Sequence, residues 1–200
     1  KSALSEFKSG LSGVSTPQTF TGRQASVSDT EVLTASASST AQEGSFELQV
    51  NNLARSQTLA SKAFGTRETV VGEGTVSIRF GTYNVVGNTF TADAERDIVS
   101  VTIDATNSSL EGIAGAINAA TPSIAASIVN DGAGERLVVT SSETGLASSM
   151  QITVSADGDG NNINDAGLSQ IAYDPTTAGV GSGANLSQAQ GALDASFSVN

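Results

Sequence analysis

The sequence contains no cysteine, no histidine and no tryptophan among its 200 residues. Without cysteine, a disulfide scaffold, a thiolate nucleophile and a thiolate metal site are all excluded. Without histidine, the usual general base and the commonest metal ligand are missing as well. These absences remove whole classes of catalytic and metal-binding chemistry.

Basic residues are also scarce, with 9 Lys and Arg against 20 Asp and Glu and a net charge of −11. Binding to a phosphate backbone depends on basic side chains that displace counterions, so nucleic acid is not an expected partner. No run approaches the roughly 18 apolar residues of a membrane span, and no basic-then-apolar leader opens the chain. A membrane is therefore not an expected partner either.

What is present is the composition of a folded protein. Hydrophobic residues make up 38% of the chain, and 200 residues are enough for one large or two small domains with cores of their own. The chain starts inside a helical pattern and stops inside a strand pattern. We therefore expect it to be a piece of a longer protein.

The first fifty residues predict a helix and then a hairpin. Leu4, Phe7 and Leu11 have the i, i+3, i+7 spacing of one helix face, and Gly10 and Gly13 supply stop signals. Residues 26–40 are rich in small and β-branched residues, and a turn at 41–44 precedes the alternating segment 45–50. Residues 26–50 are thus predicted to form a hairpin with one solvated face, whereas residues 51–64 fit a helix or an extended edge equally well.

A second strand-rich region surrounds one short helix. Alternation predicts strands at 75–81 and 98–104 before the helix, and at 124–128, 136–141 and 148–155 after it. Leu110, Ile113, Ala114 and Ile117 form the apolar stripe of the helix, a capping box of Ser108 and Glu111 begins it, and Pro122 ends it. About three turns are too few for a stable isolated helix, so the stripe should lie on a sheet.

The last forty-five residues are less informative. Gly, Asn, Asp and Ser dominate residues 157–185, which is the composition of a loop or linker. Residues 186–193 can be helical or extended, and Phe197 and Val199 predict a closing strand.

The sharpest candidate for chemistry is a calcium loop in "DGDGNNIND". Candidate ligands fall at loop positions 1, 3, 5 and 9, which are Asp157, Asp159, Asn161 and Asp165. However, position 6 is Asn162 where the turn needs Gly, and position 12 is Leu168 where a bidentate Glu is needed. An ordinary polar loop is therefore the favoured interpretation.

Other candidates also favour structural interpretations. Ser5 and Lys8 have the spacing of a Ser-Lys nucleophile pair but overlap on one helix end. A pair of carboxylates for acid–base chemistry could come from the alternating residues Asp93, Glu95 and Asp97. Arg96 lies within this run, however, and such a mixed run is more typical of a solvated face or loop.

Two glycine clusters and two glycosylation motifs complete the search. The clusters at 72–74 and 179–183 lack the lysine and the strand-to-helix setting of a phosphate loop. The acceptor motifs at Asn107 and Asn185 are formal matches of low specificity. The sequence therefore predicts no catalytic, cofactor-binding or metal-binding residue, and we expect no cofactor.

A family resemblance is carried by the helix and the strands after it. The matching positions are Leu110, Ile113, Ile117, Asn118, Ala126, residues 129–132, residues 136–138, Thr140, Ser141, Thr144 and Gly145. This pattern resembles the "IN" motif of flagellar axial proteins. Together with "GSFELQVNNLARSQTLAS" (44–61), "IAYDP" (171–175) and "FSVN" (197–200), it resembles the head of the flagellar filament cap proteins, the hook-associated FliD family. The resemblance covers residues 26–200, and Pro122 and Ser123 depart from the Asn or Gly that the family often has there.

The resemblance implies a fold class and a domain plan. The class is mainly β, or α+β, with two small strand-rich head domains, the second carrying a short helix packed on an antiparallel sheet. Residues 1–25 would be the end of a helical leg with its connector. Residues 26–65 with 186–200 would form an incomplete first head domain, and residues 66–185 a second head domain that contains the "IN" motif.

The resemblance also implies a non-enzymatic function. Proteins of this family are exported to the distal tip of the flagellar filament, where they form a homo-oligomeric ring, promote flagellin folding and insertion, and prevent monomer loss. The implied partners are further copies of the chain, flagellin and, for some members, host mucin. The alternatives are a flagellin or hook-filament junction subunit, or a surface adhesin whose loop 157–185 recognises host glycans.

Overall fold

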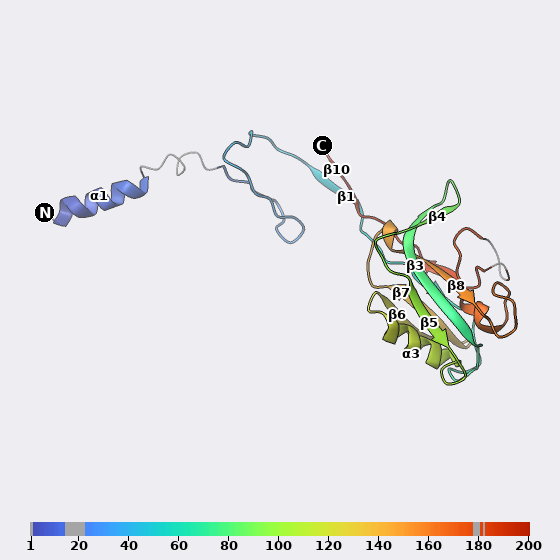
Figure 1. The fold of residues 1–200 in the computed structure, drawn as a ribbon. Coiled ribbons are helices and arrows are strands. Elements are labelled where there is room, and N and C mark those ends of the chain that lie inside the picture. Colours follow the sequence, from blue (N-terminus) through green and yellow to red (C-terminus); the bar gives the residue numbers. More distant parts are fainter. Residues whose placement is uncertain (1, 15–22, 178–180, 182) are drawn as a thin grey trace. The chain divides into compact units, whose positions relative to one another are not determined.

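The computed structural model describes residues 2–14, 23–177, 181 and 183–200 (Figure 1). The chain divides into two units, residues 1–47 with Asn200 and residues 48–199, which are treated separately. In the first unit, helix α1 spans Ser2–Val14, which confirms the predicted N-terminal helix. Its apolar residues Leu4 and Phe7 are exposed.

The predicted hairpin over residues 26–50 is wrong. Residues 26–40 contain turns and no strand, and the Asp29 carboxylate accepts a hydrogen bond from the Glu31 amide in one of these turns. Asp side chains that bond their own backbone in this way compete with strand pairing. The later half does form a strand, β1 (Leu48–Asn52), but its partner is β10 (Ser196–Val199), far along the chain.

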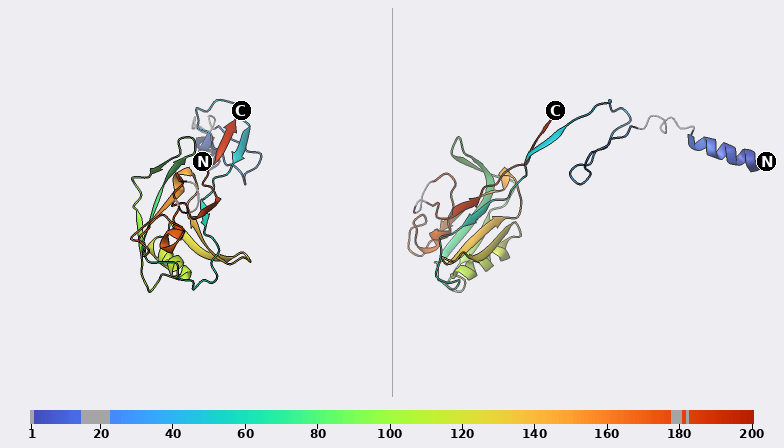
Figure 2. Two further views of the ribbon diagram at one scale, coloured as in Figure 1. Left: turned by 90° about the vertical axis from the view of Figure 1, so that its right-hand side faces the viewer. Right: turned by 180° about the vertical axis from the view of Figure 1, so that it is seen from behind.

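The second unit contains the two larger sheets. One has the order β6-β7-β2-β9, and its strands are β6 (Ile124–Asn130), β7 (Glu135–Ser141), β2 (Thr58–Ala60) and β9 (Ser187–Gln190). In the other, the long strand β3 (Gly74–Asn84) pairs with three strands: β4 (Thr89–Ala92), β5 (Val99–Ile103) and β8 (Ser149–Ser155). Every pairing in both sheets is antiparallel. Figure 2 shows β3 and β8 side by side from two further directions.

These strands confirm the predicted fold class, mainly β with a short helix on antiparallel strands. The segment 51–64, for which helix and strand were both open, is extended, and so is the open segment 186–193. The predicted domain boundaries at 65/66 and 185/186 stay a prediction. Both boundaries fall between strands of the β6-β7-β2-β9 sheet, since β2 and β9 share it with β6 and β7.

Helix α3 (Leu110–Ala120) packs against β5 and β6. Its buried residues are the four that the sequence predicted: Leu110, Ile113, Ala114 and Ile117. They join one core with buried residues of both large sheets, among them Leu59, Ile78 and Leu137. The helix therefore covers the sheets and buries its short apolar stripe against them, as a helix of this length requires.

The predicted cap of this helix is off by one residue. The N-cap is Ser109, whose hydroxyl accepts a hydrogen bond from the Gly112 amide at 3.1 Å. Ser108 is instead buried, and its carbonyl accepts a hydrogen bond from the Val71 amide at 2.8 Å. With Ser109 as N-cap, the third helical residue is Gly112, so the predicted capping box with Glu111 does not form.

Residues 157–177 are irregular but they are not a linker. They contain a short 3₁₀ helix (Gly167–Ile171), and the side chains of Leu168 and Ile171 are fully buried in the core. Tyr173 pairs with Ile152 of β8 through two backbone hydrogen bonds, which attaches the segment to the sheet. The segment is therefore part of the folded body.

Candidate functional site

The loop that resembled a calcium site is organised by hydrogen bonds within the chain. The Asp157 carboxylate is buried and accepts hydrogen bonds from the Leu168 amide, the Ser169 amide and the Ser169 hydroxyl. Position 12 of the candidate loop, Leu168, thus supplies a backbone donor to Asp157 where a metal site would supply a carboxylate. Charge-assisted bonds of this kind are the strong ones, so Asp157 fixes the loop against the core.

The remaining candidate ligands of this loop also bond to groups of the chain, and the Asn161 side chain accepts from the Ile163 amide. Asp159 accepts from the Asn164 side chain and the Asn161 amide, and these two bonds hold the pKa of its carboxyl below the ordinary value. Asp165 pairs with Lys62 at 3.1 Å. Across the described ranges, no three acidic, His or Cys side chains come together as a metal site would require.

The other candidates from the sequence lie in structural settings. Ser5 and Lys8 are exposed on α1. Asp93 and Glu95 lie in the turn between β4 and β5, where the Asp93 carboxylate accepts the Glu95 amide at 3.0 Å. The acidic run is therefore a loop, as its composition favoured.

The two glycosylation motifs carry asparagines whose side chains are engaged. Asn185 is buried, donates to two backbone carbonyls and accepts from the Gly181 amide. Asn107 accepts from the Asp104 amide and donates to the Thr102 carbonyl.

Of the glycine clusters, 179–183 lies largely outside the described residues. Gly72 abuts the backbone of Leu168, where a side chain would collide, so its absence of a Cβ serves close packing.

The motif asparagine that follows Ile117 has a defined role. The Asn118 side chain accepts from the Ala126 amide at 2.8 Å and donates to the Ala126 carbonyl at 2.7 Å. Both groups of Ala126 must therefore point away from β7, on the open edge of β6. A helix side chain thus closes the edge of a sheet that would otherwise offer unpaired backbone groups.

The edge of β5 is closed at one position and open at the next. The backbone groups of Ile152 bond Tyr173, on the side of β8 away from β3. The backbone groups of its register partner Ile78 therefore point away from β8 and toward β5. There Ile78 forms a hydrogen-bonded pair with Val99. Alternation then directs the backbone groups of Ser100 and Thr102 away from β3. The Asn107 side chain donates a hydrogen bond to the Thr102 carbonyl, whereas no described group bonds the outward backbone groups of Ser100.

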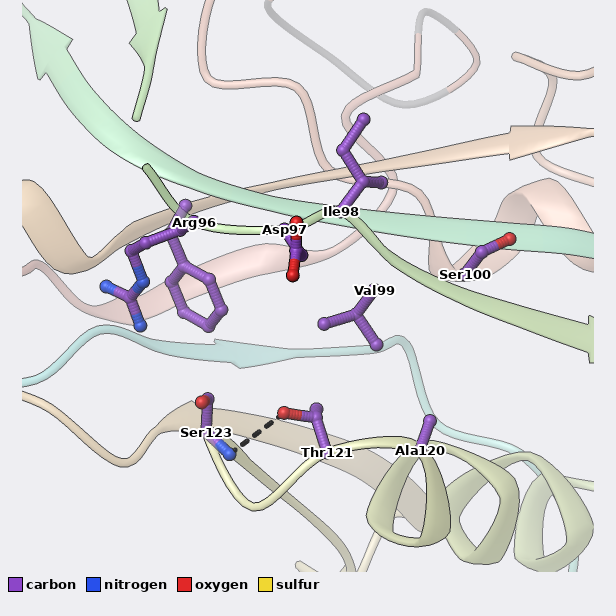
Figure 3. A pocket seen from close by; sticks show the side chains of 9 residues that line it. Arg96, Asp97, Ile98, Val99, Ser100, Ala120, Thr121 and Ser123 are labelled. Atoms are coloured by element: carbon purple, nitrogen blue, oxygen red, sulfur yellow. Dashed lines mark hydrogen bonds between the residues drawn. The ribbon is translucent and has the colours of Figure 1, made fainter. Parts of the chain in front are cut away.

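Beside this open position lies a surface hollow of about 420 Å³. Its lining residues come from β3, from the start of β5 and from the end of α3, and they are Phe80, residues 96–100, Ala120, Thr121 and Ser123. Figure 3 shows the Val99 side chain directed into this space, facing the turn in which Thr121 accepts the Ser123 amide. We call this site the hollow.

One wall of the hollow is held in place by Arg96. Its guanidinium lies 3.8 Å from the centre of the Phe80 ring, a cation–π contact, and it also pairs with Glu143 at 3.3 Å. Its other neighbour is the Ser148 hydroxyl. The Arg96 cation is therefore paired and packed on Phe80. The lining combines the apolar side chains of Phe80 and Val99 with the charged Arg96 and Asp97.

Among the helices that the structure describes, none combines the length and the apolar character needed to cross a membrane.

Comparisons with known proteins place the chain in a family. A family model described as the N-terminus of flagellar hook-associated protein 2 matches residues 1–57. The B-type flagellar hook-associated protein 2 of Pseudomonas aeruginosa is 35% identical over 181 residues, which are 89% of this chain and 35% of that protein. The crystal structure of the D2-D3 domains of the flagellar cap protein FliD from Escherichia coli is 32% identical, with a TM-score of 0.62, and the match covers 80% of this chain and 73% of that one. The chain belongs to the flagellar cap protein FliD family.

A second FliD structure agrees with the first. FliD from Pseudomonas aeruginosa PAO1 is 32% identical with a TM-score of 0.59, over 82% of this chain and 67% of that one. The resemblance inferred from the "IN" motif and the flanking segments is thereby confirmed. The chain spans about a third of the length of the curated FliD relatives that it matches.

Sequence reasoning missed the hollow and both edge closures. The hollow is built from three segments that are separate in the chain, and no local pattern in this FliD relative signals it. The motif residue Asn118 was named in the sequence, but its role was not. That role could have been inferred, because the end of an apolar helix stripe is an unusual place for a polar residue that packs against a strand.

Proposed function

We propose that the chain forms part of the head of a filament cap at the distal tip of a bacterial flagellum. There it promotes the folding and insertion of flagellin and prevents the loss of monomers, as a structural protein without catalytic activity. One observation carries this proposal: 80% of the chain matches the D2-D3 domains of the flagellar cap protein FliD from Escherichia coli, at 32% identity.

The implied partners are further copies of the chain and flagellin, and the implied location is outside the cell. The composition supports this setting. A chain without cysteine forms no disulfides that would obstruct export in an unfolded state. The predicted division into a leg, a first head domain and a second head domain belongs to the same proposal.

Immunogold electron microscopy of intact cells tests the location. Antibody against residues 48–199 should label only the far ends of filaments. Label along the whole filament or at the hook would overturn the cap proposal in favour of a shaft or junction subunit.

Binding to host mucin is a finer part of the proposal and has its own test. Removing residues 157–185 would be a poor experiment, because Leu168 and Ile171 belong to the core. The exposed Ile163 is a better target, since Ile163→Ser changes the loop surface alone. If the loop contacts mucin, this variant should bind mucin-coated plates more weakly than the parent chain, and equal binding would remove the exposed loop from consideration.

A further inference from the structure

The hairpin of β3 and β4 ends in an apolar tip. In Figure 1 the hairpin projects from the sheet on the side away from α3. We define the tip as residues 84–88, in which the side chains of Val85 and Val86 are 76% and 99% exposed. β-branched apolar side chains with this much exposure at the end of a hairpin gain no stability from the fold that carries them.

The tip is nevertheless held in one conformation. The Asn84 side chain accepts from the Val86 and Gly87 amides at 3.0 and 3.1 Å. Tyr83 donates to the Asn88 side chain, which in turn donates to the Thr176 carbonyl of another loop at 2.9 Å. A segment ordered before binding loses little conformational entropy when it binds, so the tip has the properties of a preorganised contact.

The whole outer hairpin also lacks charge. Residues 80–92 contain no Asp, Glu, Lys or Arg, although the chain carries a net charge of −11. Two copies of such an acidic chain repel each other over most of their surfaces. The hairpin itself brings no charge to a contact between two copies.

The hollow offers a complementary surface on the same chain. Phe80 and Val99 give it an apolar floor, and Arg96 and Asp97 add charged groups to its lining. The outer backbone groups of Ser100 at its edge have no partner among the described residues. The tip cannot reach its own hollow, because Val85 is five residue steps along the extended chain from Phe80, about 17 Å at 3.4 Å per residue. Only another molecule can bring the two surfaces together.

We propose that the Val85–Val86 tip of one copy inserts into the hollow of a second copy. The two surfaces lie at different places on each chain, so the contact is heterologous, and repeated contacts of this type close into a ring or continue as a filament. The proposal rests on the proposed function, since it names the self-contact by which a cap head would associate.

Cysteine cross-linking tests this contact without interference, because the chain has no cysteine of its own. Intact protein carrying Val86→Cys is mixed with intact protein carrying Ser123→Cys, which places one thiol on the tip and one in the hollow. Mild oxidation should give several-fold more cross-linked dimer than a matched mixture of Val86→Cys with Val129→Cys, an exposed residue outside the hollow. Equal yields from the two mixtures would overturn the proposal.

Two further variants separate the contact from folding. Val86→Ser removes an exposed apolar side chain, and Ala120→Phe fills the hollow from the exposed end of α3. Each should weaken self-association in sedimentation measurements while leaving the thermal unfolding curve unchanged. Unchanged association in both variants would overturn the contact.

The same samples distinguish this proposal from the proposed function. Absence of the Val86–Ser123 cross-link in protein that still labels filament tips would overturn the contact and leave the cap function standing. Cross-linking in protein that does not label filament tips would overturn the cap function and leave the contact standing.

Discussion

Replacing Asn118 tests whether a helix side chain closes the edge of β6. Asn118→Ala removes both hydrogen bonds to Ala126, each worth about 0.5–1.5 kcal/mol, so the gross loss is about 1–3 kcal/mol. Water can reach an exposed strand edge, and Ala is a better helix former than Asn by up to about 0.7 kcal/mol. We therefore expect the free energy of unfolding to fall by about 1 kcal/mol in urea titrations.

Two companion variants separate the hydrogen bonds from helix propensity. Ala119→Asn, at the exposed neighbouring position, measures the propensity difference alone. Asn118→Asp keeps the acceptor for the Ala126 amide but loses the donor to its carbonyl, and it places a negative charge at a helix C-terminus, which is unfavourable. Its stability should fall while the Ala126 amide stays bonded.

Hydrogen exchange at the Ala126 amide is the local readout. Exchange should accelerate in Asn118→Ala, whereas in Asn118→Asp the Ala126 amide should keep its protection relative to neighbouring amides of β6. If Asn118→Ala leaves both the unfolding free energy, corrected for propensity, and the Ala126 exchange rate unchanged, the edge-closing role is refuted.

Three other perturbations follow from the same structure. Asp157→Ala leaves the buried amides of Leu168 and Ser169 without an acceptor, so it should lower the unfolding free energy by about 2 kcal/mol or more. An unchanged urea midpoint would be the contrary result. Gly81→Ala places a Cβ against the Thr91 carbonyl oxygen, so hydrogen exchange should rise across β3 and β4, and unaltered protection there would contradict the steric argument. Burial raises the pKa of Tyr173, so its stabilising contribution is present below the ordinary value of about 10 and is lost as the pH rises through the folded value. In Tyr83→Phe, where Tyr173 is the sole tyrosine, the ultraviolet titration midpoint should lie above about 10 and return to it in urea.

Local periodicity was enough to predict the helix and most strands. The prediction of the four buried residues of α3 is correct because a stripe at i, i+3, i+4 and i+7 has one way to face a sheet. The cap was wrong by one residue because Ser108 and Ser109 are chemically equivalent locally. The choice between them is made by the Val71 amide, which bonds the Ser108 carbonyl from a distant part of the chain.

Long-range pairing was the main source of error. β1 was recognisable as a strand, but its partner β10 lies near the other end of the sequence, so a nearer segment was chosen. The buried Leu168 and Ile171 were hidden in a polar composition, because two apolar residues among Gly, Asn and Asp set no period. The hollow requires three separate segments to meet, which no single stretch of sequence encodes.

The pairing of β1 with β10 has a consequence for how the family can vary. Leu48 and Val199 are register partners, and such partners lie only about 5 Å apart in an antiparallel pair. The chain therefore enters and leaves residues 48–199 at almost the same point. A segment with adjacent ends can be lengthened, shortened or exchanged for another fold without changing the span that its host must bridge. This arrangement lets selection remodel the outward surface of such a protein independently of the part that carries it.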